Sequence, residues 1–206
     1  MLLIATVATL VASLTVAAPA VQTPSAPAAK GAPAAGMRSF TVDGVHSKAL
    51  FRVMHMGAGQ FWGRFNDVSG TYSFDPSDLA TAKFDVTIAI ESVDSGNGDL
   101  DKHLRSPDFF SAKDFPTMTF RSTGVEGASA AGGMLKGDLT MKGVTKPVTA
   151  KLEYTGMADM GRGMKSGFEA TFTIKRSDFG ITYGVDKGAI GDEVRVTVAL
   201  EGNLAK

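Results

Sequence analysis

The stretch AKFDVTIAI, residues 82–90, places an apolar side chain at every second position and mostly polar ones between them. Because successive side chains of a β-strand point to opposite faces, this period of two predicts a strand with one buried face. Runs of the same kind recur from residues 48–55 to residues 194–200, and Gly, Asn, Asp and Pro separate them. About eight such runs, counting one near residues 148–154, predict half-buried antiparallel strands.

The near absence of long helices limits how these strands can close. An open sheet needs helices to cover it, so strands without helices favour an all-β sandwich or a closed barrel. A barrel of about eight strands is the size that holds one small ligand in its interior.

Three short helical turns are predicted in the loops. The first follows Asp75, whose side chain can cap it. The second starts at Ser95 or Asn97 and carries acidic residues early and basic residues late, which suits the helix dipole. The third starts at residues 106–108 and must end before Pro116.

The last two turns belong to one long insertion, residues 92–120. Structureless connections of this length are uncommon in compact domains, so we expect the insertion to cover something. Its polar first half predicts a lid held by Asp99, Asp101 and Arg105. The pair Phe109–Phe110 is expected to turn inward.

The N-terminal residues differ in composition from the rest. Residues 2–16 are almost wholly apolar and small residues follow at positions 18 and 20, which is typical of a secretory signal peptide spanning residues 1–20. An uncleaved membrane anchor is the rival interpretation, although the apolar run is short for a spanning helix. Residues 21–38, rich in Ala, Pro and Gly, predict a disordered linker, and residues 39–206 have the size of one domain. We therefore expect an exported protein, periplasmic or secreted.

The composition also excludes some partners and bonds. The chain has no cysteine, so no disulfide forms and burial alone must hold the fold together. Its 21 basic and 21 acidic residues balance, so no net field attracts nucleic acid or an anionic membrane surface. We expect no nucleic-acid partner.

The apolar positions are rich in phenylalanine. Thirteen Phe accompany three Tyr and one Trp, which supplies large aromatic volume with few polar groups. Gly70 and Gly137 fall on the same parity as the apolar residues, and together these features predict a cavity shaped for an apolar guest. A solid-cored structural or adhesion domain is the alternative, against which the inward glycines argue.

Motifs for catalysis are missing. The sequence has no Gly-x-Ser-x-Gly elbow, no cysteine nucleophile and no complete dinucleotide or phosphate loop. The acidic run after Asn97 superficially matches a calcium loop, but Lys102 stands where the sharp turn requires glycine, so helix capping explains it better. We predict no catalytic residue and no metal site.

The histidines are the remaining candidates for polar chemistry. His46 and His55 are nine residues apart, so on one uninterrupted strand they point to opposite faces and share no metal. His55 has the parity of Phe51 and Val53, which we expect to face inward. It is therefore either a core histidine with one backbone hydrogen bond or a polar contact for the head group of a ligand.

Two arginines stand at the ends of predicted elements. Arg105 closes the second helical turn, and Arg176 follows the strand pattern of residues 168–174. We predict that both are structural ties, which pair with Asp94, Asp99 or Asp178.

Several sequence blocks occur in an order that covers nearly all of residues 40–202. They are VDGVHSKALFRVMH (42–55), WGRF (62–65), SVDSGNGDLDKHLRSPDFF (92–110), FPTMTF (115–120), GDLTMKGVTKPV (137–148) and KRSDFGI (175–181). In this combination the chain resembles the YceI family of polyisoprenoid-binding, lipocalin-like proteins. The resemblance implies an extended eight-stranded antiparallel barrel, with a long apolar cavity for an isoprenoid or similar lipid tail. It also implies a bacterial, typically periplasmic, setting.

Strand parity and this resemblance together predict which residues line the cavity. The ligand-binding candidates are Phe51, Val53, His55, Phe84, Val86, Ile88, Phe109, Phe110, Met118, Phe120, Leu139 and Phe172.

The predicted function is non-enzymatic binding, with sequestration or transport, of a long apolar lipid, isoprenoid or quinone-like, inside the barrel. That lipid is the one bound group we expect, with no cofactor besides it. The alternative is an enzyme or redox participant that acts on a bound quinone-like molecule, for which His55 is the candidate titrating group. Replacing His55 by Phe should then abolish turnover and leave lipid capture intact. Transient membrane contact and a homodimer stay open as further partnerships.

Overall fold

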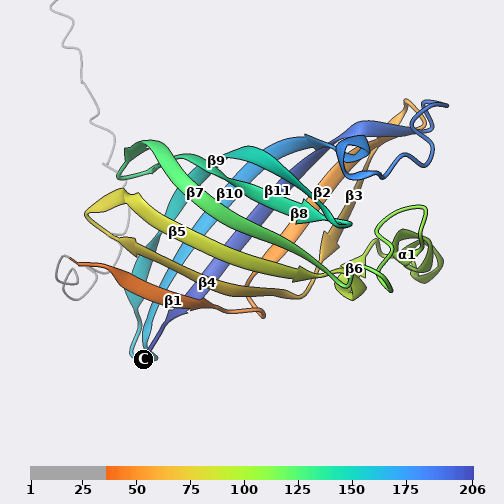
Figure 1. Cartoon of the computed structure of the whole chain (residues 1–206). Helices are drawn as coiled ribbons and strands as arrows, with labels where there is room; N and C mark the ends of the chain where they lie inside the picture. The colour runs from red at the N-terminus through yellow and green to blue at the C-terminus, as the bar shows by residue number, and fades with distance from the viewer. Residues whose placement is uncertain (1–35) are drawn as a thin grey trace, which may run out of the picture.

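A computed structural model describes residues 36–206, which form one antiparallel sheet wound into a barrel (Figure 1). The predicted signal peptide, residues 1–20, and the linker up to residue 35 lie outside the described residues. The first strand begins at Arg38, one residue before the predicted start of the domain. Within residues 36–206, no helix is long and apolar enough to cross a membrane.

Eight strands form a closed ring, which confirms the predicted all-β barrel. Each pairs antiparallel with the next, and the pairing of Phe40 with Leu204 joins the first strand of the ring to the last. In ring order the strands are β1 (Arg38–Val42), β4 (Val68–Asp75), β5 (Asp78–Ala89), β7 (Thr117–Ser129), β8 (Gly132–Met141), β9 (Val144–Asp159), β10 (Met164–Lys175) and β11 (Ile190–Leu204).

Three more strands extend the wall at one end of the barrel. They are β2 (Lys48–His55), β3 (Gly59–Phe65) and β6 (Val93–Asp94), which pair in the order β11–β2–β3–β6. β11 pairs with β1 near its C-terminal end and with β2 along its N-terminal part. Residues 43–47 therefore interrupt the extended segment, and β1 and β2 are two separate strands.

The helical predictions are right in part. Asn97, not Ser95, caps α1 (Gly98–Arg105), the one α-helix among residues 36–206, by accepting hydrogen bonds at its side-chain oxygen. The turn after Asp75 is a tight hairpin turn instead of a helical one, and the segment from Ser106 to Pro116 forms hydrogen-bonded turns without a helix. Two short 3₁₀-helices, η1 (Ile90–Ser92) and η2 (Arg176–Phe179), were not predicted.

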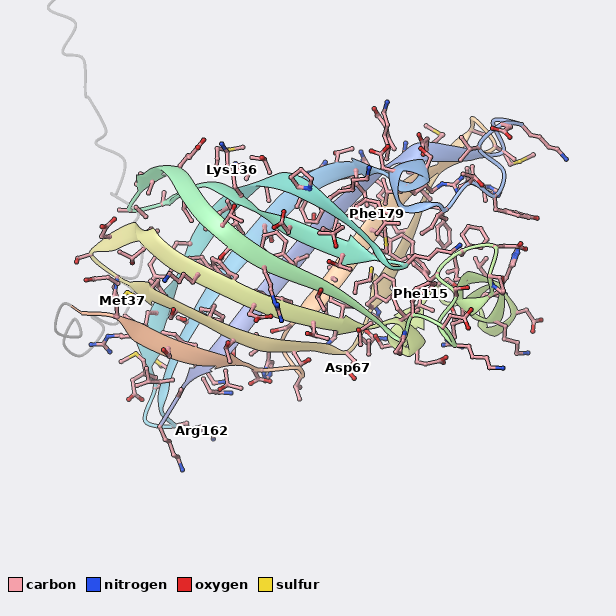
Figure 2. The ribbon with its side chains drawn as sticks, viewed as in Figure 1. Met37, Asp67, Phe115, Lys136, Arg162 and Phe179 are labelled. Atoms are coloured by element: carbon pink, nitrogen blue, oxygen red, sulfur yellow. The ribbon has the colours of Figure 1, made fainter. Side chains whose placement is uncertain are left out.

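The two ends of the barrel differ in construction. One end, which we call the mouth, carries α1 and η2, and Phe115 and Phe179 lie there (Figure 2). Arg162 lies at the opposite end, near the C-terminus (Figures 1 and 2). The core between them is almost wholly apolar, and its fully buried side chains include Phe40, Tyr72 and Phe74.

Candidate functional site: an apolar cavity with one polar end

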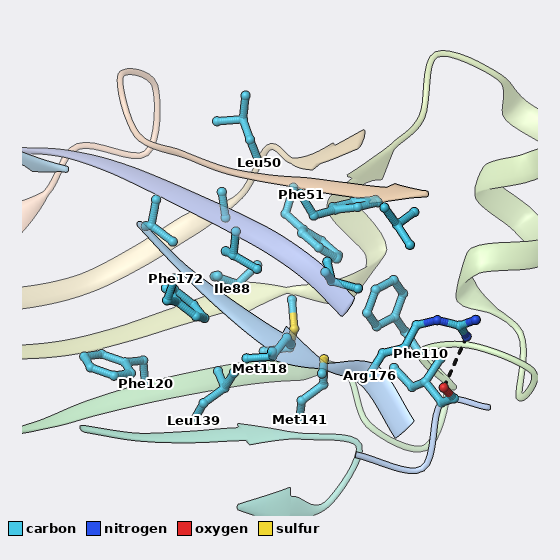
Figure 3. Close-up of a pocket in the computed structure, with 18 of the residues that line it drawn as sticks. Leu50, Phe51, Ile88, Phe110, Met118, Phe120, Leu139, Met141, Phe172 and Arg176 are labelled. Atoms are coloured by element: carbon cyan, nitrogen blue, oxygen red, sulfur yellow. Dashed lines mark hydrogen bonds between the residues drawn. The ribbon is translucent and has the colours of Figure 1, made fainter. Parts of the chain in front are cut away.

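The barrel encloses a cavity of about 460 Å³. Ligand pockets for drug-sized molecules run from roughly 300 to 1,000 Å³, so this volume is in their range. Its walls come mainly from the inward parity of β2, β5, β7, β8, β10 and β11, and Figure 3 shows residues such as Phe51, Ile88 and Phe120 converging on it.

All the predicted ligand-binding residues lie on this wall. They are Phe51, Val53, His55, Phe84, Val86, Ile88, Phe109, Phe110, Met118, Phe120, Leu139 and Phe172. That each of them touches a ligand stays a prediction. The inward residues of β11, from Val194 to Leu200, also line the cavity, and their alternation in the sequence could have identified them.

The inward glycines do not open the cavity, so that interpretation of the sequence was wrong. At Gly137 a Cβ would collide with the ring of Phe120, and at Gly63 with the ring of Phe51. Gly70, with φ of 128°, lies against the backbone of Asp85. The glycines at positions 63 and 137 let a neighbouring aromatic ring lie flat against the sheet.

A cluster of aromatic side chains closes the cavity at the end opposite the mouth. We call this the aromatic plug, made of Phe40, Tyr72, Phe74, Tyr154 and Phe168. The ring of Phe168 lies 5.0 Å from that of Phe74 and 5.1 Å from that of Tyr154. Phe168 is also part of the cavity wall, so the plug forms the cavity floor.

One buried polar contact fastens the plug. The Tyr72 hydroxyl donates to the carbonyl oxygen of Ser166 over 2.7 Å, and the Ser166 hydroxyl also lies 2.7 Å away. Burial raises the pKa of Tyr72 to about 12. The hydroxyl therefore stays protonated and acts as a donor at any physiological pH.

The lid at the mouth is tied to the barrel by α1 and the residues before it. The Asp101 carboxylate accepts hydrogen bonds from the backbone and the hydroxyl of Ser95, at 2.7 and 2.6 Å. Arg105 donates to the backbone oxygens of Glu91 and Val93 and pairs with the Glu91 carboxylate at 3.3 Å. Arg105 is therefore a structural tie between α1 and the residues before it, as predicted, although its acidic partner is Glu91. Asp101 holds α1 to Ser95 within the insertion.

Asp99 and Asp94 behave differently from the sequence-based expectation. Among the described residues, Asp99 forms an ion pair only with Lys102, one turn further along α1. Its side chain is 92% exposed, so it does not hold the lid. Asp94 accepts from Arg64 at 2.8 Å and from Asn66 at 3.0 Å, and these bonds lower its pKa to about 2.

Arg176 is a structural tie, as predicted, but its partners are backbone carbonyls. It is buried and donates to the carbonyl oxygens of Gly191, Tyr183, Ile190 and Ile181, at 2.8, 2.8, 2.9 and 3.2 Å. No described carboxylate forms an ion pair with it, so the expected pairing with Asp178 was wrong. Burial lowers the pKa of Arg176, and the four carbonyls stabilise the cation. Figure 3 places Arg176 beside Phe110 at the mouth.

The polar side chains of the cavity wall gather at the mouth. His55 lines the cavity but is exposed, and within residues 36–206 its ring has no hydrogen-bond partner. The core-histidine interpretation was therefore wrong, and contact with a ligand head group stays a prediction. His103 bonds to Asp108 at 3.1 Å and packs edge-on against Tyr183, with ring centres 5.0 Å apart. Sequence reasoning missed His103 and Tyr183 because neither lies on a strand, where parity gives the direction.

His46 belongs to a separate ion-pair cluster. It stands in the turn between β1 and β2, with its Nδ1 3.0 Å from Asp43 and 3.6 Å from Glu201. The Lys165 ammonium reaches the same two carboxylates, at 3.1 and 2.7 Å. Hydrogen bonds from His46 and Lys165 hold the pKa of Asp43 well below its usual range. The cluster fastens the β1–β2 turn to β10 and β11.

Residues 40–202 match the family described as the YceI-like domain. A UPF0312 protein of Pseudomonas aeruginosa is 41% identical over 161 residues, which cover 78% of this chain and 83% of that protein. The crystal structure of a Campylobacter jejuni YCEI protein is similar, with a TM-score of 0.68 and 34% identity, over 74% of this chain and 90% of that one. A polyisoprenoid binding domain from Saccharophagus degradans shares the fold, with a TM-score of 0.63 at 15% identity, over 82% of this chain and 99% of that domain.

Proposed function

Because the chain belongs to the YceI-like family, and its barrel encloses an apolar cavity, we propose that it binds a long apolar lipid without converting it chemically. The observation that carries the proposal is the cavity wall, which is built almost entirely from Phe, Leu, Val, Ile, Met and Ala side chains. Removing apolar surface from water contributes about 25 cal/mol per Å², so such a wall favours a hydrocarbon guest.

The cavity volume sets the size of that guest. A cavity of roughly 150 Å³ takes up one benzene molecule. The volume of about 460 Å³ therefore accommodates on the order of 15–20 carbon atoms, or three to four isoprene units. The Saccharophagus domain is described as polyisoprenoid binding, so isoprenoid chains are the ligand class to test first. Quinone-like tails share the same chemistry.

The distribution of polar groups gives the ligand a direction. The closed end is the aromatic plug, which offers no free polar group to a guest. The open end carries His55, His103 and Tyr183 on the cavity wall. The tail thus points to Phe168 and the head group remains at the mouth, which suits a protein that sequesters or carries lipids outside the cytoplasm after export.

The test combines extraction with one variant that fills the cavity. Native mass spectrometry and solvent extraction of protein purified from its source cell should reveal about one long-chain lipid per chain. Ala170 faces the cavity from β10, so Ala170→Phe should abolish capture of a fluorescent isoprenoid alcohol.

The matched control is Ala199→Phe. Ala199 alternates with the inward residues Val198 and Leu200 on β11 and so faces outward. This variant should keep full capture, with thermal unfolding of both variants confirming the fold. A wild-type protein that yields no lipid and takes up no probe would contradict the proposal.

A further inference from the structure

We propose that the outer face of β2, β3 and β11 next to the mouth docks onto a bilayer surface that contains anionic phospholipids. The docking patch consists of Arg52, Met54, Met56, Trp62 and Arg195. It differs from the cavity in place and chemistry, and the docking itself does not depend on what the cavity holds.

The patch is a single row across three neighbouring strands. Arg195 of β11 lies opposite Arg52 of β2, and Arg52 lies opposite Trp62 of β3. Their strand neighbours Val194, Val53 and Phe61 line the cavity. Because side chains alternate along a strand, Arg195, Arg52 and Trp62 all point away from the barrel.

The two arginines lack acidic partners. Within residues 36–206 no carboxylate lies within 4.0 Å of either guanidinium, and no hydrogen bond to a protein acceptor satisfies them. The neighbouring Arg64, by contrast, pairs with Asp94 at 2.8 Å. Like charges directly opposite each other on a sheet are unfavourable, so Arg52 and Arg195 are suited to sharing an anion. A guanidinium binds phosphate through two parallel hydrogen bonds.

Exposed apolar side chains accompany these charges. Trp62 is 53% exposed, Met54 38% and Met56 64%. The Arg52 guanidinium lies over the Trp62 ring, 5.6 Å from its centre. Trp with Arg is the combination that settles at the level of lipid head groups, where the ring is half in hydrocarbon and the cation contacts phosphate. The β2–β3 turn, residues 56–58, carries no charge that would oppose insertion.

The patch adjoins the opening of the cavity. His55, on the cavity wall, lies between Met54 and Met56 in the chain, and the Met56 amide donates to the carbonyl oxygen of Ala189 over 2.7 Å. In Figure 1 the β2–β3 turn and the loop before β11 lie together at that end of the barrel, across from α1. Docking there would let a lipid pass between bilayer and cavity without crossing water, a consequence that rests on the proposed function.

The net charge of the chain is zero, so this attraction is local. Beyond about 8–10 Å at physiological salt the field of two arginines is screened. The contact is therefore short-ranged, reversible and sensitive to salt.

Trp62 provides the experiment, because it is the only tryptophan in the chain. Vesicles of phosphatidylglycerol and phosphatidylcholine should shift its fluorescence to the blue, and brominated lipids in them should quench it. Vesicles of phosphatidylcholine alone should bind much more weakly. The double variant Arg52→Gln, Arg195→Gln should lose roughly 30-fold in vesicle affinity, since each basic side chain near an anionic surface contributes about fivefold.

The control is Arg162→Gln, which removes an exposed cation at the far end of the barrel and should leave vesicle binding unchanged (Figure 2). Equal binding to both kinds of vesicle, or an equal loss in the control, would overturn the proposal. A dimer in solution that buries Trp62, or capture of an acidic protein with no vesicle binding, would overturn it as well.

Failure of docking and failure of lipid capture are separable. Ala170→Phe blocks the cavity and should still bind vesicles, while the double arginine variant should still take up a soluble short-chain probe.

Discussion

The Tyr72 hydroxyl donates a hydrogen bond to the carbonyl oxygen of Ser166 over 2.7 Å, and so joins β4 to β10 across the cavity floor. The two residues are 94 positions apart in the chain. Tyr72 and Ser166 are both buried, so water cannot replace either partner. This contact and the rings around it set the depth of the cavity.

Tyr72→Phe should lower the free energy of unfolding by about 2 kcal/mol, because it leaves the buried polar groups of Ser166 without this partner. Urea unfolding measures the loss. Tyr154→Phe is the control, since it removes a hydroxyl from the same cluster at a half-buried position and should cost less. Equal losses in the free energy of unfolding for the two variants would show that the Tyr72–Ser166 hydrogen bond stabilises the fold no more than the Tyr154 hydroxyl does.

Phe168→Leu should deepen the cavity. The ring of Phe168 closes the floor against Phe74, Phe84 and Tyr154. In a series of isoprenoid alcohols of rising length, affinity for the wild type should stop increasing near the capacity of its cavity, and affinity for the variant should increase further. Phe179→Leu is the control, because it makes the same substitution at a buried position outside the cavity wall. It should lower stability by a comparable amount, roughly 1 kcal/mol, without changing the length limit. An unchanged length limit in Phe168→Leu would refute the role of the floor.

Arg176→Met should loosen the loop between η2 and β11. The substitution leaves four carbonyl oxygens of residues 181–191 without their common donor. Amide hydrogen exchange should accelerate at least tenfold in that segment, and stability should fall by about 3 kcal/mol. Lys175→Met, at an exposed neighbour, should change neither. Uniform acceleration over the whole barrel would instead indicate global destabilisation.

Asp43 should make stability depend on pH. Its folded-state pKa is lowered from 3.8 by His46 and Lys165, so the folded protein holds fewer protons than the unfolded chain in this range. The stabilisation is therefore complete above about pH 5 and is lost as the pH falls through 4 and below. In Asp43→Asn this component is missing. The difference in unfolding free energy between wild type and variant should shrink between pH 5 and pH 3, as followed by urea titrations; a constant difference would contradict this origin.

Local sequence patterns were enough to predict the strands and the direction of their side chains. Alternation in residues 82–90 reflects a local property of the extended backbone, in which each side chain faces opposite to the next. For this reason the residues of β2, β5, β7, β8 and β10 that were predicted to face inward all lie on the cavity wall. The N-terminal cap of α1 also depends only on nearby residues, because Asn97 accepts hydrogen bonds from the amides two and three residues further along.

The neighbours of each residue, by contrast, depend on contacts between distant parts of the chain. Ser47 bonds to Glu201 across 154 positions, and Arg176 collects carbonyls from a loop that has no periodic pattern. Because Gly137 has no side chain, the sequence suggested open space at this position, yet the ring of Phe120 fills the space above it. Such contacts depend on strand register and barrel closure, which arise from the balance of many distant pairings. The pairing of β2 with β11 and with β3 brought Arg52, Trp62 and Arg195 into one row, and the fold placed the polar residues of the cavity at one end.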